Sequence, residues 1–340
     1  MTSFRRYFLS HLKANARTYL TITIGILAMT FLIGMNLQPI DVSRERYQST
    51  LFGPVLFLCI LAYFLPVWEL SFFKNRAHLD FAYALPISRQ AMGVAHYLSG
   101  LLMLLGGFSL SYLLNFLLLL HHGREHFHLS PLLWHYLLCL LLGFALYSFL
   151  TFVFNEANSK GDGIWFMILY TFVFVAVAYG IGTVRDRFMS HGYVSLKALD
   201  VSLPFGVIDA LTTDFQKFVE MKRQALTFWA TTEHVVGFIV WCAVGLASAI
   251  GFLLTFGKRR VEKTEEISSS YFGFRTLIPI YAIVMMNNVS YGVSYLSDKI
   301  IIGAFIELFV FIGYAIYRRG VRYKAVDLIA PLAVFLLIFM

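Results

Sequence analysis

The sequence predicts an all-α, polytopic helical membrane protein, and three observations lead to this prediction. Of its 340 residues, 59% are hydrophobic and 14% are charged, whereas a soluble domain carries about 25% charged residues. The apolar residues form continuous blocks, and a block of about 20 residues is long enough to cross a bilayer as a helix. Polar and apolar residues do not alternate within these blocks, which favours helices over a β-barrel.

The apolar blocks predict eight membrane spans, at residues 19–37, 51–70, 92–120, 132–154, 164–183, 235–256, 277–296 and 300–317. The first six form the predicted core, 18–257. A polar linker, 258–276, separates this core from additional C-terminal spans at 277–340. A ninth block, 328–340, is too short to span upright, so it is predicted to be either a truncated span or an interfacial segment.

The net charge of +8 comes from lysines and arginines that are sorted by loop. With the N-terminus in the cytoplasm, the inner loops hold most of them, and the short outer loops hold Arg44, Arg46, Arg124 and Lys299. This is the positive-inside pattern of multi-pass proteins. It indicates a lipid bilayer, here the plasma membrane, and no nucleic acid as the partner. The long segment 184–234 is then predicted to lie outside.

Residues 1–17 are predicted to form an amphipathic elbow helix on the inner leaflet. Phe4, Phe8 and Leu12 recur every four residues, and basic residues lie between them. A helix with one apolar and one basic face is typical of a membrane surface.

A short polar segment, 73–89, interrupts the apolar sequence between the second and third spans. Its residues predict a short amphipathic helix at about 75–86 on the cytoplasmic side. Pro86 disfavours helical geometry at Leu85, so this helix should end there. Ser88 can cap the helix that continues into the third span.

This segment resembles the coupling helix of type-2 ATP-binding-cassette (ABC) transporter permeases of the Gram-positive bacterial kind. The resemblance is carried by Lys74-Asn75-Arg76, Asp80-Phe81 and Leu85-Pro86-Ile87-Ser88-Arg89, preceded by Glu69. The layout is also similar, with an elbow helix, six spans and a large outer segment. The resemblance implies that the ATPase subunit docks on Asn75, Arg76, Leu79, Asp80, Phe81, Tyr83, Leu85, Pro86 and Arg89.

The resemblance implies a permease subunit of an ATP-driven exporter of an amphiphile, peptide or antibiotic. Such a subunit pairs with a second permease copy or a paralogue, and a separate subunit uses ATP and Mg²⁺. The residues agree with a chain that is no enzyme and holds no cofactor. The nearest match to a phosphate-binding loop, at Gly251 and Gly257-Lys258, has the wrong spacing and no following Ser or Thr.

Two other functions stay open. An integral membrane enzyme at the outer face would use His121, His122, Glu125, His126 and His128. Their spacing matches no closed zinc site and the loop has no cysteine, so no metal is predicted there.

An ion-coupled carrier would use Glu307, which lies mid-span and can also form a polar contact with Asn287, Asn288 or Ser290. The six-span core is expected to hold almost no ionisable group inside the bilayer, with Glu69 at a membrane edge and His96 near the inner surface. That expectation disfavours ion coupling. In the sixth span, Ala243, Ala247 and Gly251 form a small-residue stripe that suits either internal packing or a dimer face.

Overall fold

The computed structural model describes residues 3–35, 45–122, 129–188, 232–258, 274–292 and 295–318, with single residues and short stretches elsewhere. The described residues are helical and contain no strand, which confirms the all-α class. The chain divides into two compact units. Unit 1 comprises Met1–Asn155 and Pro204–Val261, and unit 2 comprises Glu156–Leu203 and Glu262–Met340.

Within the described residues, six helical segments are long and apolar enough to cross a membrane, so the chain is a multi-pass helical membrane protein. They are Phe4–Gly34, Leu51–Lys74, Arg89–His121, Leu132–Glu156, Val235–Phe256 and Leu296–Arg318. Two further predicted spans, 164–183 and 277–296, correspond to α6 (Lys160–Phe188) and α10 (Phe274–Gly292). The ninth block, 328–340, lies almost wholly outside the described residues, so the full number of spans stays a prediction.

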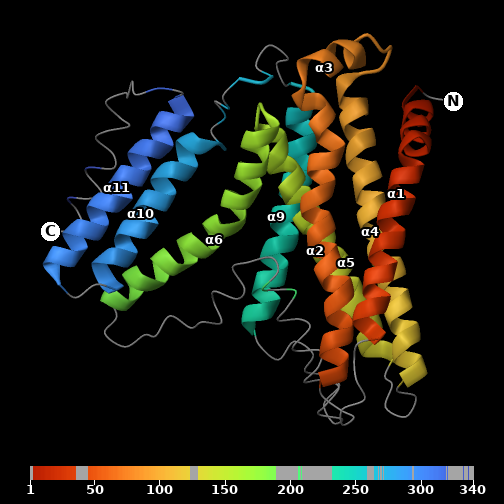
Figure 1. The fold of residues 1–340 in the computed structure, drawn as a ribbon, viewed down its shortest axis with the longest axis horizontal. Helices are drawn as coiled ribbons and strands as arrows, with labels where there is room; N and C mark the ends of the chain where they lie inside the picture. The colour runs from red at the N-terminus through yellow and green to blue at the C-terminus, as the bar shows by residue number, and fades with distance from the viewer. Residues whose placement is uncertain are drawn as a thin grey trace. The chain divides into compact units, whose positions relative to one another are not determined.

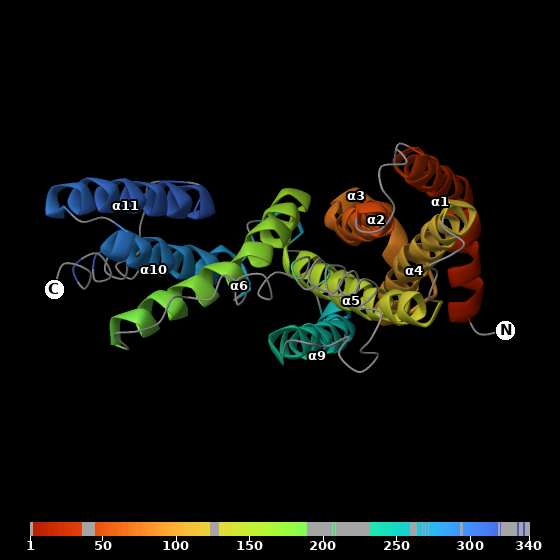
Figure 2. The ribbon, with the colours of Figure 1, turned by 90° about the horizontal axis from the view of Figure 1, so that it is seen from below.

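Unit 1 is a helical bundle (Figure 1). Its elements are α1 (Ser3–Met35), α2 (Glu45–Leu70), the 3-10 helix η1 (Ser71–Lys74), α3 (Arg76–Tyr83), α4 (Arg89–His122), α5 (Leu129–Glu156, whose last residue belongs to unit 2) and α9 (Thr232–Phe256). Helix α4 packs against both α1 and α2, as the view in Figure 2 shows. The largest fully buried side chains include Phe108, Tyr147, Phe154 and Phe252.

The N-terminal segment differs from the predicted arrangement of a separate elbow helix followed by a span. Helix α1 runs without interruption through 33 residues, from Ser3 to Met35. At about 1.5 Å per residue it is about 50 Å long, whereas the hydrocarbon core of a bilayer is about 30 Å thick. One end of α1 therefore extends beyond the apolar core as part of the same helix.

Unit 2 is built from α6, α10 and α11 (Leu296–Arg318). Helix α10 packs on both α6 and α11, and the Tyr281 hydroxyl donates to the Leu169 carbonyl at 2.6 Å. Span 164–183 was predicted to belong to the six-span core, whereas the compact units group α6 with the C-terminal helices.

In unit 2, Ser268 and Ser270 of the predicted linker 258–276 contact Glu156 at the end of α5 and Asp162 in the first turn of α6. The Ser268 amide donates to Asp162 Oδ2 at 3.2 Å, and its hydroxyl donates to the Glu156 carbonyl at 3.1 Å. The Ser270 hydroxyl donates to Glu156 Oε2 at 2.9 Å.

Candidate functional site

The connection between α2 and α4 forms the predicted short helix with a cap at each junction. Asn75 has an extended backbone, and its Oδ1 accepts the Ala77 amide at 3.0 Å, which makes it the N-cap of α3. Helix α3 ends at Tyr83, two residues before Leu85. The Ser88 hydroxyl accepts the Ala91 amide at 3.2 Å, which confirms the predicted cap of α4.

The side chains predicted to dock an ATPase differ in exposure. Arg76, Asp80, Pro86 and Arg89 are exposed, Asn75 and Leu85 are half-buried, and Leu79 is buried at 2% exposure. The side chains of Phe81 and Tyr83 lie outside the described residues. Exposed residues on α3 and on the turn after it are accessible to a partner, whereas Leu79 holds α3 on the bundle.

Buried contacts fasten η1, which leads into α3, to the ends of two other helices. Lys74 is 2% exposed, and its Nζ donates to the Asn155 carbonyl at 3.1 Å, near the C-terminus of α5. A cation at this position is favourable because helix C-termini carry partial negative charge. The Phe73 ring packs edge-on against Phe256 of α9, with 5.1 Å between ring centroids. A displacement of η1 therefore acts on α5 and α9 as well as on α2 and α4.

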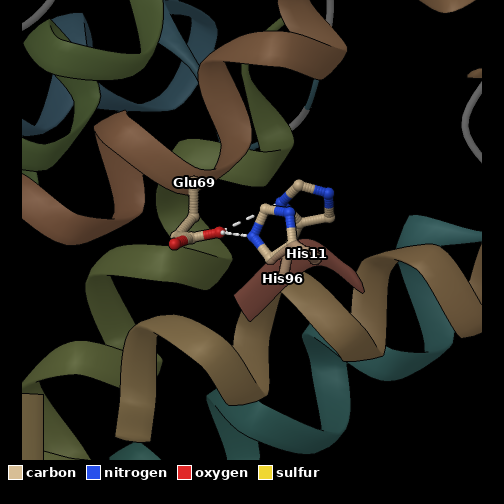
Figure 3. A group of neighbouring side chains, drawn as sticks. All are labelled: His11, Glu69 and His96. Carbon is tan, nitrogen blue, oxygen red and sulfur yellow. Dashed lines mark hydrogen bonds and ion pairs between the residues drawn. The ribbon is translucent and has the colours of Figure 1, made fainter. Parts of the chain in front are cut away.

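A buried cluster of ionisable side chains lies beside η1 and joins three helices (Figure 3). His11 Nε2 of α1 lies 2.9 Å from Glu69 Oε2 of α2, and His96 Nδ1 of α4 lies 3.0 Å from the same oxygen. The two imidazole centroids are 4.0 Å apart. Side-chain exposure is 14% for His11, 6% for His96 and 1% for Glu69. We call these residues the His–Glu–His cluster.

Further side chains complete the hydrogen bonds of the cluster. Tyr19 donates its hydroxyl to Glu69 Oε1, the Tyr7 hydroxyl lies 3.1 Å from His96 Nε2, and Asn15 Nδ2 lies 3.3 Å from His11 Nδ1. A carboxylate can only accept, so each imidazole nitrogen facing Glu69 donates to it. The outward nitrogens of the two rings then accept, from Tyr7 and from Asn15. Both oxygens of the buried Glu69 carboxylate and all four imidazole nitrogens therefore have hydrogen-bond partners.

Ionisable side chains are buried inside unit 1. Glu69 and His96, predicted at a membrane edge and near the inner surface, are 2% and 5% exposed, and His135 of α5, which the sequence did not single out, is fully buried. His11 was missed although the sequence holds a signal for it. Tyr7, His11, Asn15 and Tyr19 recur every four residues, which puts hydrogen-bonding groups on one helical face.

Of the other two candidate sites, the structure describes Glu307, but it describes only His121 and His122 of the outer cluster. Glu307 of α11 is 8% exposed, and neither carboxylate oxygen has a hydrogen-bond partner among the described residues. Of its three expected partners, the side chains of Asn288 and Ser290 lie outside the described residues. His121 and His122 end α4, whereas Glu125, His126 and His128 lie outside the described part.

The comparisons add no relative to this picture. No protein-family model, curated protein or solved structure matches the chain.

Proposed function

We propose that this chain is the membrane-spanning permease subunit of an ABC transporter, an exporter of an amphiphile, peptide or antibiotic. A separate ATPase subunit docks on the α2–α4 connection and hydrolyses ATP with Mg²⁺, and a second permease copy or a paralogue completes the membrane part.

The observation that carries the proposal is that α3 has exposed residues, while the elements on either side of it are held by buried contacts. This eight-residue helix presents Arg76 and Asp80 to solvent. The elements on either side of it are anchored by buried contacts, of which the bond from Lys74 to Asn155 is the clearest. A force applied to α3 therefore reaches several membrane helices, and relaying such a force is what a permease driven by a soluble motor must do.

The test is co-purification in mild detergent from the native membrane, with ATPase activity and mass spectrometry as readouts. Asp80→Arg and Leu85→Glu each change an accessible residue to one of opposite character. We expect either change to lower the recovered ATPase by at least about tenfold, because a like-charge contact at position 80 costs several kcal/mol, an unpaired charge buried in an apolar contact at position 85 is also costly, and about 1.4 kcal/mol is a factor of ten.

Asp298→Arg is the matched control. It makes the same charge change at an exposed position in the first turn of α11, an end that the sequence predicts to lie on the outer side, so it should leave ATPase recovery unchanged. Unchanged recovery and ATP hydrolysis in both α3 variants would contradict the docking site.

Buried Glu307, without a hydrogen-bond partner in the described part of the chain, favours an ion-coupled carrier as the second candidate. Gradient-driven uptake by the purified chain in liposomes, without any ATPase and lost in Glu307→Gln, would support that function and contradict the first.

A further inference from the structure

We propose that the His–Glu–His cluster is a binding site for a divalent transition metal, and that Zn²⁺ is the ion that fits it best. His11, Glu69 and His96 each offer one ligand atom, and these three atoms lie within 4.8 Å of one another. Two imidazoles and a carboxylate are the protein ligands of one common kind of zinc site, in which water or another small ligand takes the fourth position. This inference does not depend on the proposed transport function.

The two distances from Glu69 to the imidazole nitrogens suit a tetrahedral ion after a small movement, and the two nitrogens lie within 4.8 Å of each other. Zinc binds nitrogen and oxygen at about 2.0–2.2 Å, so its ligand atoms lie about 3.3–3.5 Å apart. In the structure Glu69 Oε2 lies 2.9 Å from His11 Nε2 and 3.0 Å from His96 Nδ1. An opening of a few tenths of an ångström exchanges these two hydrogen bonds for two bonds to a metal.

The surrounding side chains support the tautomers that metal binding requires. Zinc takes the place of the protons on His11 Nε2 and His96 Nδ1, and each ring then carries its proton on the other nitrogen. For His96 that nitrogen is 3.1 Å from the Tyr7 hydroxyl, which can accept as well as donate. For His11 it lies 3.3 Å from Asn15 Nδ2, and the Asn15 amide must turn over, giving up its bond to the His11 carbonyl, before its oxygen can accept from this nitrogen. Both rings stay neutral and the proton count is unchanged.

The charge of the site also favours a cation. Glu69 is 2% exposed, and no lysine or arginine is among the groups bonded to it in the described residues. A buried carboxylate is costly unless it is paired with a cation or bound to a metal. His11, at 14% side-chain exposure, is the most accessible of the three ligands.

A metal here would fasten α1 to the α2–α4 pair. The ligands come one from each helix, and the Phe73 ring of η1 packs edge-on against His96 with 4.9 Å between centroids. Occupancy of the site therefore bears on the segment that leads into α3.

The experiment measures Zn²⁺ binding by the purified full-length chain, by competition with a chromophoric chelator and by metal analysis after dialysis. The chain carries a tag without histidine, and His121, His122, His126 and His128 are replaced by Asn so that the outer loop contributes nothing. We expect about one Zn²⁺ per chain. Co²⁺ in its place should give the intense visible absorption of a tetrahedral site.

Three variants test the ligands and their support. His11→Ala should weaken binding by more than about 100-fold, since loss of even an outer partner costs about 10–100-fold, and Tyr7→Phe should cost about tenfold. His11→Cys restores a zinc ligand and should recover most of the affinity. His78→Ala removes an exposed histidine outside the cluster and should leave binding unchanged.

Recovery by His11→Cys separates metal binding from folding, because Ala and Cys remove the same hydrogen bonds to the imidazole. The proposal is overturned if the parent chain binds no Zn²⁺, or if His11→Ala binds it as tightly as the parent. It is also overturned if His11→Ala and His11→Cys lose binding equally, which would make the cluster a hydrogen-bonded structural contact. None of these results would count for or against the proposal that an ATPase docks on α3.

Discussion

Asn75 caps the N-terminus of α3 and stabilises this short helix. An isolated helix of eight residues is unstable, because nucleation is costly, so its cap contributes a large share of its local stability. Asn75→Ala removes the acceptor of the Ala77 amide and should cost about 0.5–2 kcal/mol. We expect faster amide hydrogen exchange over residues 76–83 and, under the proposed function, weaker recovery of the ATPase.

Asn75→Asp is the control for this prediction, because aspartate caps a helix about as well as asparagine. It should keep both slow exchange in α3 and ATPase recovery. If Asn75→Asp loses ATPase recovery while exchange in α3 stays slow, then Asn75 contacts the partner directly and is not a positioning residue.

The individual residues of the polar cluster were partly visible in the sequence. Glu69 and His96 stand out as ionisable groups near span ends, but nothing local shows that they touch. Their contact depends on how α2 and α4 pack, and a sequence pattern gives the face of a helix without giving the helix that it meets. For His11, the spacing of Phe4, Phe8 and Leu12 predicts the apolar face of the helix. It does not show that the polar face of the same helix meets Glu69.

At the scale of the elements, α5 and α9 approach closely at one glycine. A Cβ on Gly245 would overlap the Cα and Cβ atoms of Ala145, and a backbone atom cannot swing aside as a side-chain tip can. Gly245→Ala should therefore push the helices apart and cost about 1–3 kcal/mol, as overpacking does. Thermal unfolding in detergent should occur at a lower temperature.

Gly106→Ala is the matched control, since a Cβ there meets no heavy atom within 4 Å. Alanine is the better helix former by about 1 kcal/mol, so this change should leave stability equal or slightly higher. Equal stability of Gly245→Ala and Gly106→Ala would show that α5 and α9 do not pack as described.

The long helices were well predicted, because the length of an apolar block is enough to identify a membrane-spanning helix. The cap at Ser88 and the short helix before it were also predicted correctly, because both depend on the residues of the segment itself. The small-residue stripe has a mixed outcome, because Ala243 and Ala247 are exposed whereas Gly251 lies against Phe152 of α5. Its spacing of four residues did not single out buried Gly245, where α9 approaches the backbone of α5.

For the whole molecule, the structure supports one part of the predicted topology. The sequence assigned the N-terminus, the α2–α4 connection and the ends of α5 and α9 to the same side. Unit 1 brings them together at one end (Figure 1), through contacts such as Tyr7 with His96, Lys74 with Asn155 and Phe73 with Phe256. Which side of the membrane this end faces is a prediction from the positive-inside pattern.

Cysteine labelling decides the side. In a background with Cys59, Cys139 and Cys242 replaced by Ala, Arg76→Cys places an exposed thiol on α3, and Asp298→Cys places one in a predicted outer loop. A membrane-impermeant maleimide added to intact cells should label Asp298→Cys and leave Arg76→Cys unlabelled. Permeabilised cells should give labelling at both positions, which controls for reactivity. Labelling of Arg76→Cys in intact cells would place α3 outside, where no ATP-driven subunit can reach it, and the proposed function would then be wrong.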